Sequence, residues 1–240
     1  MCGRFTATFV EPHMIAGRFG VSEAAIPGAT LGRYNVCPTE QVLAVCGGPQ
    51  RRAARDLRWG LLPPWARSLR SGPEPINARA ETLLEKRRFA PLLERADRRC
   101  LVLADGWYEW LRPERPRGDR VPFRYTVDGG APFAFAGLWD ENRVDGARVA
   151  SVTVLTTAAN EICAPVHDRM PCVLASEEAE AAWLSPELDA RAAFELLAEP
   201  LAAARTAAAP ANPAVNKAGV EGAELLVVPA DTGPVQLELG

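Results

Sequence analysis

The sequence predicts an α+β fold built on a mostly antiparallel sheet or barrel, and three observations support this class. Short apolar runs that are typical of strands recur along the chain, separated by glycine, proline and aspartate turns. Segments with helical spacing are interspersed among these runs. The chain has 240 residues, 48% hydrophobic and 24% charged, so it can bury a sizeable core. Without a repeat or a break in composition, we expect one domain over residues 1–240, with a surface loop at the Ala- and Pro-rich residues 200–214.

The predicted strands are short apolar runs that stop at turn residues. The turns are expected at Gly47-Gly48, Pro63-Pro64, Asp128-Gly129-Gly130 and Asp145-Gly146. The predicted strands cover residues 41–46, 55–62, 100–104, 121–127, 132–139, 149–156 and 225–229.

Helices are predicted in two parts of the chain. Leucine and phenylalanine recur at helical spacing over residues 80–99, with arginines on the other face, and Pro91 is expected to kink or split this helix. Ser176 followed by two glutamates is typical of a helix N-terminus. We therefore expect one helix over residues 176–184 and a second over residues 187–199.

The charge of the chain is small in total but unevenly distributed. The formal net charge is −3, which at first argues against a nucleic-acid partner. Residues 1–124 carry 21 basic and 13 acidic side chains, whereas residues 125–240 carry 6 basic and 17 acidic ones. A cationic face on an acidic protein remains compatible with phosphate binding.

Neither the start of the chain nor its cysteines indicate export. No long apolar stretch follows the first arginine, and the longest uncharged apolar stretch, Val149 to Asn160, is too short to cross a membrane. We therefore expect a cytoplasmic protein without disulfides. The six cysteines include no C-x-x-C pair and the chain has two histidines, so we expect no zinc site. Four cysteines are expected to be buried apolar residues: Cys46, Cys100, Cys163 and Cys172.

Cys2 differs from the other cysteines because it follows the initiator methionine. Methionine removal generally requires a small second residue, and it would leave Cys2 with a free α-amine next to its thiol. The reference pKa of an α-amine is about 7.7–8.0, so roughly a tenth of it is neutral at pH 7. A neutral amine condenses with an aldehyde to an imine, and the thiol can then close a thiazolidine ring. The pair suits aldehyde capture or, equally, an N-terminal-nucleophile hydrolase in which the amine is the base.

Two further side chains are candidates for proton transfer. His167, in Val-His-Asp-Arg-Met-Pro, follows the predicted strand 149–156 in a loop, and histidine is the usual proton shuttle near neutral pH. Glu109 lies between aromatic residues in Ala-Asp-Gly-Trp-Tyr-Glu-Trp, where desolvation would raise its pKa toward that of an acid/base catalyst. The other histidine, His13, is expected on a surface helix. From the residues alone, a purely structural role for His167 or Glu109 stays an alternative.

Another pair of motifs combines arginine with aromatic residues. In Ile-Asn-Ala-Arg-Ala-Glu-Thr (76–82), the Asn77 amide can donate and accept hydrogen bonds and Arg79 can bind an anion. Before it lies Arg-Trp-Gly-Leu-Leu-Pro-Pro-Trp (58–65), in which we expect Trp59 to be part of the core. Interleaved basic and aromatic residues are what a single-stranded nucleic-acid groove needs, since they provide phosphate contacts and stacking platforms.

Together these motifs resemble the SRAP family, the SOS response-associated peptidase proteins that shield abasic sites in single-stranded DNA. The resemblance rests on Met1-Cys2-Gly3-Arg4-Phe5, Tyr34-Asn35-Val36 with Pro38, Trp59-Gly60 through Trp65, Ile76-Asn77-Ala78-Arg79 with Glu81-Thr82, Ala104 to Trp110, His167-Asp168-Arg169 with Pro171, Val215-Asn216 and Gly222-Ala223-Glu224-Leu225. The motifs follow the family's order over nearly the whole chain, and their joint occurrence is specific.

The resemblance implies a role for each of four residues. Cys2 is similar to the family's crosslinking nucleophile, which attacks the ring-opened aldehyde of an abasic deoxyribose and forms a thiazolidine DNA–protein crosslink. Asn77 matches the residue that positions the sugar and the terminal amine. His167 matches the acid/base group that helps open the sugar ring, and Glu109 matches the acidic residue that moves protons near the amine and assists reversal. Lyase-like and autoproteolytic activities are also implied.

The resemblance further implies a single-stranded DNA partner that contains abasic sites, a monomer, and neither cofactor nor metal nor membrane contact. It places the protein in the cytoplasm, associated with the nucleoid when bound to DNA. Phosphate-binding positions are matched by Arg4, Arg79, Arg87 and Arg169. Positions that wedge against or stack on bases are matched by Pro38, Trp65 and Trp110. The chain departs from the pattern in a longer loop at residues 66–75 and in Ala66, where some relatives carry a second tryptophan.

Two other function classes stay open at this point. An N-terminal-nucleophile cysteine peptidase or amidase would use the same Cys2, and a non-covalent single-stranded DNA binder would keep the groove with an inactive site. The arginine- and tryptophan-containing groove favours DNA over a peptide.

Overall fold

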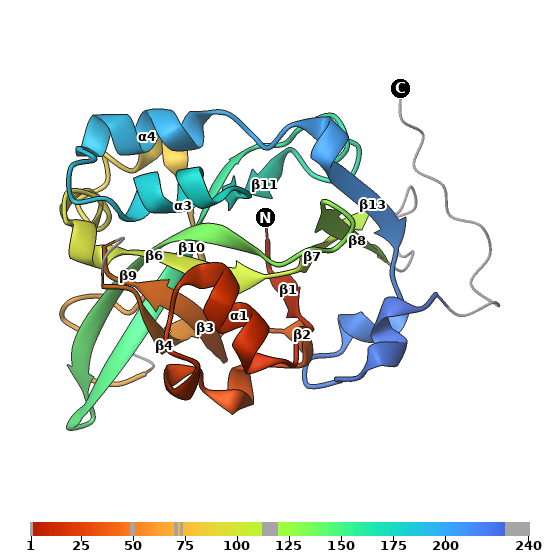
Figure 1. Ribbon diagram of the computed structural model, residues 1–240, viewed down its shortest axis with the longest axis horizontal. Coiled ribbons are helices and arrows are strands. Elements are labelled where there is room, and N and C mark those ends of the chain that lie inside the picture. The colour runs from red at the N-terminus through yellow and green to blue at the C-terminus, as the bar shows by residue number, and fades with distance from the viewer. Residues whose placement is uncertain (1, 49–50, 70–71, 73, 112–119, 229–240) are drawn as a thin grey trace.

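The computed structural model describes residues 2–228, apart from 49–50, 70–71, 73 and 112–119, and forms two sheets flanked by helices (Figure 1). The larger sheet has eight strands in the order β11-β10-β4-β3-β6-β9-β12, with β5 beside β10. Its strands are β3 (Gln41–Cys46), β4 (Ala53–Trp59), β5 (Asn77–Arg79), β6 (Arg99–Ala104), β9 (Phe133–Val144), β10 (Ala147–Ala158), β11 (Arg169–Pro171) and β12 (Val173–Leu174).

Five strands of the larger sheet close into a barrel. β10 pairs with β9 along one edge and with β4 along the other, and β4, β3, β6 and β9 pair in sequence between them. The pairings of β10 with β4 and with β5 are parallel, and the other pairings of the described strands are antiparallel. This arrangement confirms the predicted α+β class with a mostly antiparallel sheet or barrel.

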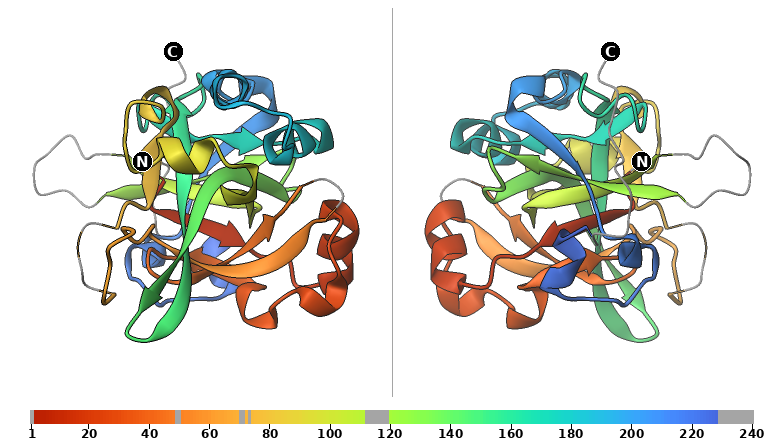
Figure 2. Two further views of the ribbon diagram at one scale, coloured as in Figure 1. Left: turned by 90° about the vertical axis from the view of Figure 1, so that its left-hand side faces the viewer. Right: turned by 90° about the vertical axis from the view of Figure 1, so that its right-hand side faces the viewer.

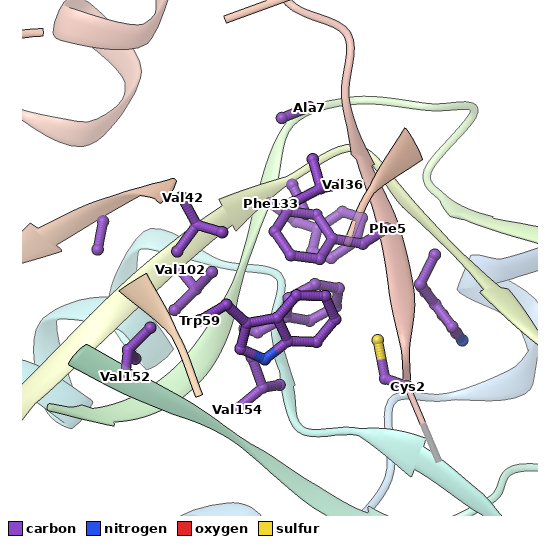
Figure 3. Close-up of a cluster of buried hydrophobic side chains, with 14 of the residues drawn as sticks. Cys2, Phe5, Ala7, Val36, Val42, Trp59, Val102, Phe133, Val152 and Val154 are labelled. Atoms are coloured by element: carbon purple, nitrogen blue, oxygen red, sulfur yellow. The ribbon is translucent and has the colours of Figure 1, made fainter. Parts of the chain in front are cut away.

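The alternation of side chains along each strand gives the barrel an inner and an outer face. The inner face carries one apolar cluster, which includes Val42, Ala44, Leu57, Val102 and Val152 (Figure 3). The residues between them, such as Leu43 and Leu101, belong to a second cluster on the outer face. Gly137 makes room in the interior, since a Cβ there would lie 2.9 Å from the Cys100 sulfur.

The smaller sheet covers one end of the barrel with aromatic side chains. Its order is β13-β8-β7-β1-β2, with β1 (Arg4–Ala7), β2 (Arg33–Val36), β7 (Gly106–Leu111), β8 (Val121–Val127) and β13 (Thr206–Pro210). The Phe5 ring lies 5.1 Å from Trp59 at the end of β4 and 5.7 Å from Phe135 near the start of β9. Trp107 stacks on Tyr125 across the β7–β8 pair at 5.2 Å. These contacts join the two sheets into one core.

The helices cover the outer face of the barrel (Figure 2). They are α1 (Pro12–Phe19), α2 (Ala90–Leu93), α3 (Glu177–Leu184) and α4 (Ala190–Ala198). The Ser176 hydroxyl accepts a hydrogen bond from Ala179 N at the start of α3, and the Trp183 indole donates to the Cys100 carbonyl at 3.0 Å. Short 3₁₀ helices lie at Glu23–Ala25, Gly28–Thr30, Ala80–Thr82, Ala96–Arg98, Ala203–Arg205, Pro213–Asn216 and Ala223–Leu226.

Three sequence predictions of elements are wrong in whole or in part. The expected helix over 80–99 is a 3₁₀ turn, the short α2 and a second 3₁₀ turn; the predicted split at Pro91 is present, because the proline lacks a backbone N–H and stands in the first turn of α2. The expected surface loop at 200–214 contains β13, whose backbone is paired with β8 over five residues despite its alanine-rich sequence. The late strand expected at 225–229 is a 3₁₀ helix as far as Leu226, and residue 229 lies outside the described residues.

Within the described residues, none of the helices has the length and apolar character that crossing a membrane would require.

Candidate active site

Cys2 lies just before β1, at the edge of the barrel's apolar interior (Figure 3). β1 runs antiparallel to β7 with Arg4 opposite Tyr108, so Cys2 faces the part of β7 that carries Glu109. The Cys2 side chain is fully buried. Burial, together with the negative charge of Glu109, raises the pKa of the thiol well above its ordinary value. The thiol is therefore held in its protonated form next to a carboxyl group.

Asn77 reaches Cys2 from the larger sheet. β5 pairs in parallel with β10 and places Asn77 opposite Val154. From there the Asn77 side-chain N–H donates a hydrogen bond to the Cys2 carbonyl oxygen at 2.7 Å. The other side-chain atom, Oδ1, is buried and has no hydrogen-bond partner among the residues described. Asn77 thus fixes the backbone of Cys2 and keeps an acceptor available for another donor.

Glu109 is buried on β7 with a raised pKa. Desolvation is the main cause, and the negative charge of Asp168 adds to it. Burial raises the pKa of Tyr125 and that of Cys163, the latter to about 12. The negative charge of Glu109 adds to both shifts. Asp168, Tyr125 and Cys163 thus each interact electrostatically with Glu109, and the raised pKa of Glu109 suits it to move a proton near neutral pH.

His167 is held in the loop that follows β10. Asn160 fixes the start of this loop, because its side-chain oxygen accepts from Cys163 N and its amide donates to Leu201 O and to Thr206. The Arg169 backbone N–H donates to His167 Nδ1 at 3.0 Å, which places the proton of a neutral imidazole on Nε2. The Asp168 carboxylate lies 2.9 Å from the same Nδ1, which in the protonated ring would donate to Asp168 instead of accepting from Arg169.

The structure thus brings three predicted site residues together and places the fourth beside them. Asn77 contacts Cys2 directly, Glu109 acts on the Cys2 thiol through its charge, and His167 adjoins Asp168, whose charge acts on Glu109. They come from the segment before β1, from β5, from β7 and from the loop after β10. The pairing of strands that are distant in sequence assembles this arrangement.

The predicted DNA-contacting residues divide into exposed and engaged side chains. Arg79 and Arg87 are exposed, and Arg79 shares one side of β5 with Asn77 because side chains alternate along a strand. Trp65 is 60% exposed. The others are half-buried: Pro38 in the turn after β2, Arg4, which donates to Asn35 and to the Val215 carbonyl, and Trp110, which donates to Asn216.

Arg169 is the most strongly engaged of these residues. Its guanidinium pairs with both oxygens of Glu81, with Nη2 at 2.8 Å from Oε2, and also donates to the Thr156 carbonyl. The arginine lowers the pKa of Glu81, mainly through these hydrogen bonds. A phosphate at Arg169 would therefore have to replace Glu81 or share the guanidinium with it.

Sequence reasoning did not assign a role to Tyr125, Cys163, Asp168 or Glu81. Cys163 is buried as expected, but the structure also places it within reach of the Glu109 charge. Asp168 and Glu81 lie inside the motifs around His167 and Arg79. Their negative charge close to a candidate base or arginine was the signal from which a role could have been predicted. Tyr125 had no such signal, because only the β7–β8 register brings it beside Trp107.

Among the described residues, histidine, cysteine, aspartate and glutamate side chains do not gather in groups of three or more that could hold a metal ion.

The chain matches known proteins over most of its length. The family model described as SOS response associated peptidase (SRAP) matches residues 1–218. The abasic site processing protein YoqW of Bacillus subtilis is 39% identical over 188 residues, which cover 78% of this chain and 81% of the relative. The abasic site processing protein YedK of Escherichia coli is 32% identical over 231 residues, covering 94% and 99%. A crystal structure of a Bacteroides thetaiotaomicron protein, 22% identical, has the same fold with a TM-score of 0.74 over 88% of this chain and 92% of its own. This chain belongs to the SOS response associated peptidase (SRAP) family.

Proposed function

We propose that this protein captures abasic sites in single-stranded DNA by forming a covalent thiazolidine between Cys2 and the aldehyde of the opened sugar. Relatives named abasic site processing protein support the lesion as substrate. The observation that carries the proposal is the hydrogen bond from Asn77 to the Cys2 carbonyl, with the Glu109 carboxyl group close enough to act on the thiol.

The first step requires removal of Met1, which frees the α-amine of Cys2. The neutral amine attacks the aldehyde carbon, and loss of one water molecule gives an imine. Asn77 holds the Cys2 backbone during this step, and its unpartnered Oδ1 is an acceptor for an N–H of the amine or a hydroxyl of the sugar. His167, with its proton on Nε2, is the group that can protonate the ring oxygen as the sugar opens.

In the second step the thiol adds to the imine carbon and closes a five-membered ring. A sulfur–carbon bond forms, the C=N π bond breaks, the thiol proton leaves and the nitrogen gains a proton, so the step is neutral overall. The raised pKa of Glu109 suits it to accept the first proton and to supply the second. Transfer of these two protons in the opposite direction opens the ring to the imine, and addition of one water molecule to the imine then releases the aldehyde of the DNA.

The exposed arginines and tryptophan provide the means to hold the strand. Arg79 and Arg87 are available for phosphate contacts, and the exposed Trp65 ring offers a face on which a base can stack. Because Arg79 shares a side of β5 with Asn77, a phosphate bound there would lie next to the reacting sugar.

A crosslinking gel tests the proposal. Purified protein whose N-terminus has been read by mass spectrometry is incubated with single-stranded DNA that carries one abasic site. We expect a denaturation-resistant species whose mass is that of both partners minus one water. Cys2→Ala should abolish it, whereas Cys172→Ala, which removes a buried thiol on the outer face of the barrel, should leave it unchanged.

Absence of the species from wild type with a free Cys2 amine, or its persistence in Cys2→Ala, contradicts the proposal. Turnover of a peptide by a protein that ignores abasic DNA would instead identify an N-terminal-nucleophile peptidase. Binding of DNA without a covalent species would identify a non-covalent binder.

A further inference from the structure

The barrel has a second end, remote from the smaller sheet, where its interior opens into a cavity of about 460 Å³. Four of the five barrel strands contribute lining residues at inward-facing positions: Cys46 on β3, Arg55 on β4, Trp139 on β9 and Arg148 on β10. Figure 1 shows this end where β3, β4, β9 and β10 extend away from β7 and β8. Mouths of barrels and volumes of a few hundred cubic ångströms are typical of small-ligand sites.

Four arginines give the cavity a positive character. Arg51, Arg55, Arg98 and Arg148 line it against two carboxylates, Asp97 and Glu141. Glu141 pairs with Arg148 at 2.9 Å, and Arg98 lies 3.8 Å from Asp97 and 3.5 Å from Asp140. By contrast, no carboxylate of the described residues pairs with Arg51 or with Arg55. The cavity therefore contains guanidinium groups whose charge the surrounding protein does not neutralise.

Trp139 forms the floor between these arginines. The guanidinium carbons of Arg55 and Arg98 lie 5.1 and 4.9 Å from its ring centroid, and the side chain is 7% exposed. Its indole N–H is buried and has no hydrogen-bond acceptor among the described residues. Buried polar groups are nearly always hydrogen-bonded, so this donor lacks the acceptor that its position calls for.

The position of Arg55 is unusual for a structural arginine. It alternates with Leu57 and Trp59, which fill the barrel interior, so it stands where the strand pattern calls for an apolar side chain. Planar guanidinium groups bind the paired oxygens of phosphate with two hydrogen bonds. Several such groups around one cavity, together with a buried N–H donor, form a complement to a phosphate rather than to a neutral ligand.

We propose that the arginine-lined mouth of the barrel, at Arg51, Arg55, Arg98 and Trp139, is a binding site for a phosphate-bearing anion. The phosphate belongs either to a small polyphosphate or to the backbone of a nucleic-acid strand that leaves the Cys2 site. The site is independent of the crosslinking chemistry, since it shares no residue with it.

Titration calorimetry with inorganic pyrophosphate at low ionic strength tests the site. We expect saturable binding by wild type, and binding about tenfold weaker in Arg55→Gln and in Arg51→Gln. The matched control is Arg191→Gln, which removes the same charge from the exposed face of α4 and should leave the affinity within about twofold. Arg51 is exposed, so its variant keeps the test valid if Arg55→Gln fails to fold.

Competition by an oligothymidylate without abasic sites distinguishes the sources of the phosphate. Displacement of pyrophosphate by the oligonucleotide in a Cys2→Ala background identifies a nucleic-acid backbone, and lack of displacement identifies a small polyphosphate. Absence of saturable binding by wild type at up to about 10 mM pyrophosphate, or an equal loss in Arg191→Gln, overturns the proposal. Neither result depends on whether Cys2 forms a crosslink.

Discussion

The two ends of the barrel use polar side chains in opposite ways. At the Cys2 end, the site residues come from segments outside the closed barrel, and its central groups, Cys2 and Glu109, are buried with raised pKa values. At the arginine end, defined by Arg51, Arg55, Arg98 and Trp139, the charges come from the barrel strands and from the segments that join them, and they line an open cavity. At the Cys2 end, burial favours the protonated form of the ionisable groups. At the arginine end, positively charged groups are exposed to solvent.

A packed apolar interior separates the two ends. Trp59, Phe135, Val102 and Val152 belong to the apolar cluster that fills the barrel between them. The two ends share no residue, and the effects of substitutions at distant sites without shared partners are usually additive. We therefore expect substitutions at one end to leave the activity of the other end unchanged. Crosslinking at the Cys2 end and pyrophosphate binding at the arginine end can thus serve as controls for each other.

The largest effect is expected from blocking the amine at the Cys2 end. A glycine inserted before Cys2, which remains after methionine removal, turns the amine into an amide that cannot form an imine. Crosslinking to abasic single-stranded DNA should fall by at least about 10³-fold, as for loss of a catalytic nucleophile. A denaturing gel measures it, and pyrophosphate binding at the arginine end should not change. Crosslinking at an undiminished rate would show that the α-amine is not the reacting group.

The second effect concerns the buried carboxyl group. Glu109→Gln keeps the shape of the side chain but cannot exchange protons, so ring closure and its reversal should slow by about 10²-fold. Rates of crosslink formation and release, measured separately on gels, should both fall. An unchanged rate for both steps would assign the proton transfer to another residue.

The same substitution should make the fold more stable than wild type, by a margin that grows as the pH rises. The folded-state pKa of Glu109 is raised, so the carboxyl group ionises near its reference pKa of about 4.3 only in the unfolded chain and at higher pH in the folded one, whereas the glutamine variant ionises in neither state. The free energy of unfolding of wild type should therefore fall below that of Glu109→Gln as pH rises through the folded pKa. Below pH 4 the two should agree. Urea titrations at acid and neutral pH measure the difference, and a constant gap would contradict it.

The third effect is that of the amide that positions Cys2. Asn77→Ala removes the hydrogen bond to the Cys2 carbonyl and should slow crosslinking by about tenfold, the factor that corresponds to about 1.4 kcal/mol. Asn212→Ala, which removes a surface asparagine near the C-terminal 3₁₀ helices, is the matched control. Equal rates in the two variants would show that Asn77 does not position the reacting residue.

The sequence predicted local features of the fold well and long-range ones poorly. The strand at Gln41–Cys46 and the cap at Ser176 were predicted correctly, because an apolar run and a capping hydroxyl act over a few residues. The strand at Thr206–Pro210 was missed, since alanines carry no strand preference and its pairing with β8 decides its conformation.

The same distinction separates the two ends of the barrel. The residues of the Cys2 end stand in short motifs with recognisable chemistry, so the sequence alone singled out Cys2, Asn77, Glu109 and His167. The arginine end has no motif, because Arg55, Arg98, Trp139 and Arg148 lie far apart in sequence and only the strand register brings them to one mouth. A single sequence contains no signal for that register.

The smallest effect is expected from freeing Arg169, which is paired with a carboxylate, unlike Arg55 at the arginine end. Arg169 at the Cys2 end is held by Glu81, whereas Arg55 at the arginine end has no carboxylate partner among the described residues. Glu81→Gln should release Arg169 and strengthen binding of undamaged single-stranded DNA by about threefold, with the salt dependence steeper by about 0.7 for one added phosphate contact. Glu85→Gln removes an exposed carboxylate four residues away and is the matched control. Fluorescence anisotropy at several salt concentrations measures both quantities. If the two variants bind equally, net charge alone sets the affinity and Arg169 serves the fold; if only Glu81→Gln changes the slope, the ion pair is what withholds this arginine from DNA.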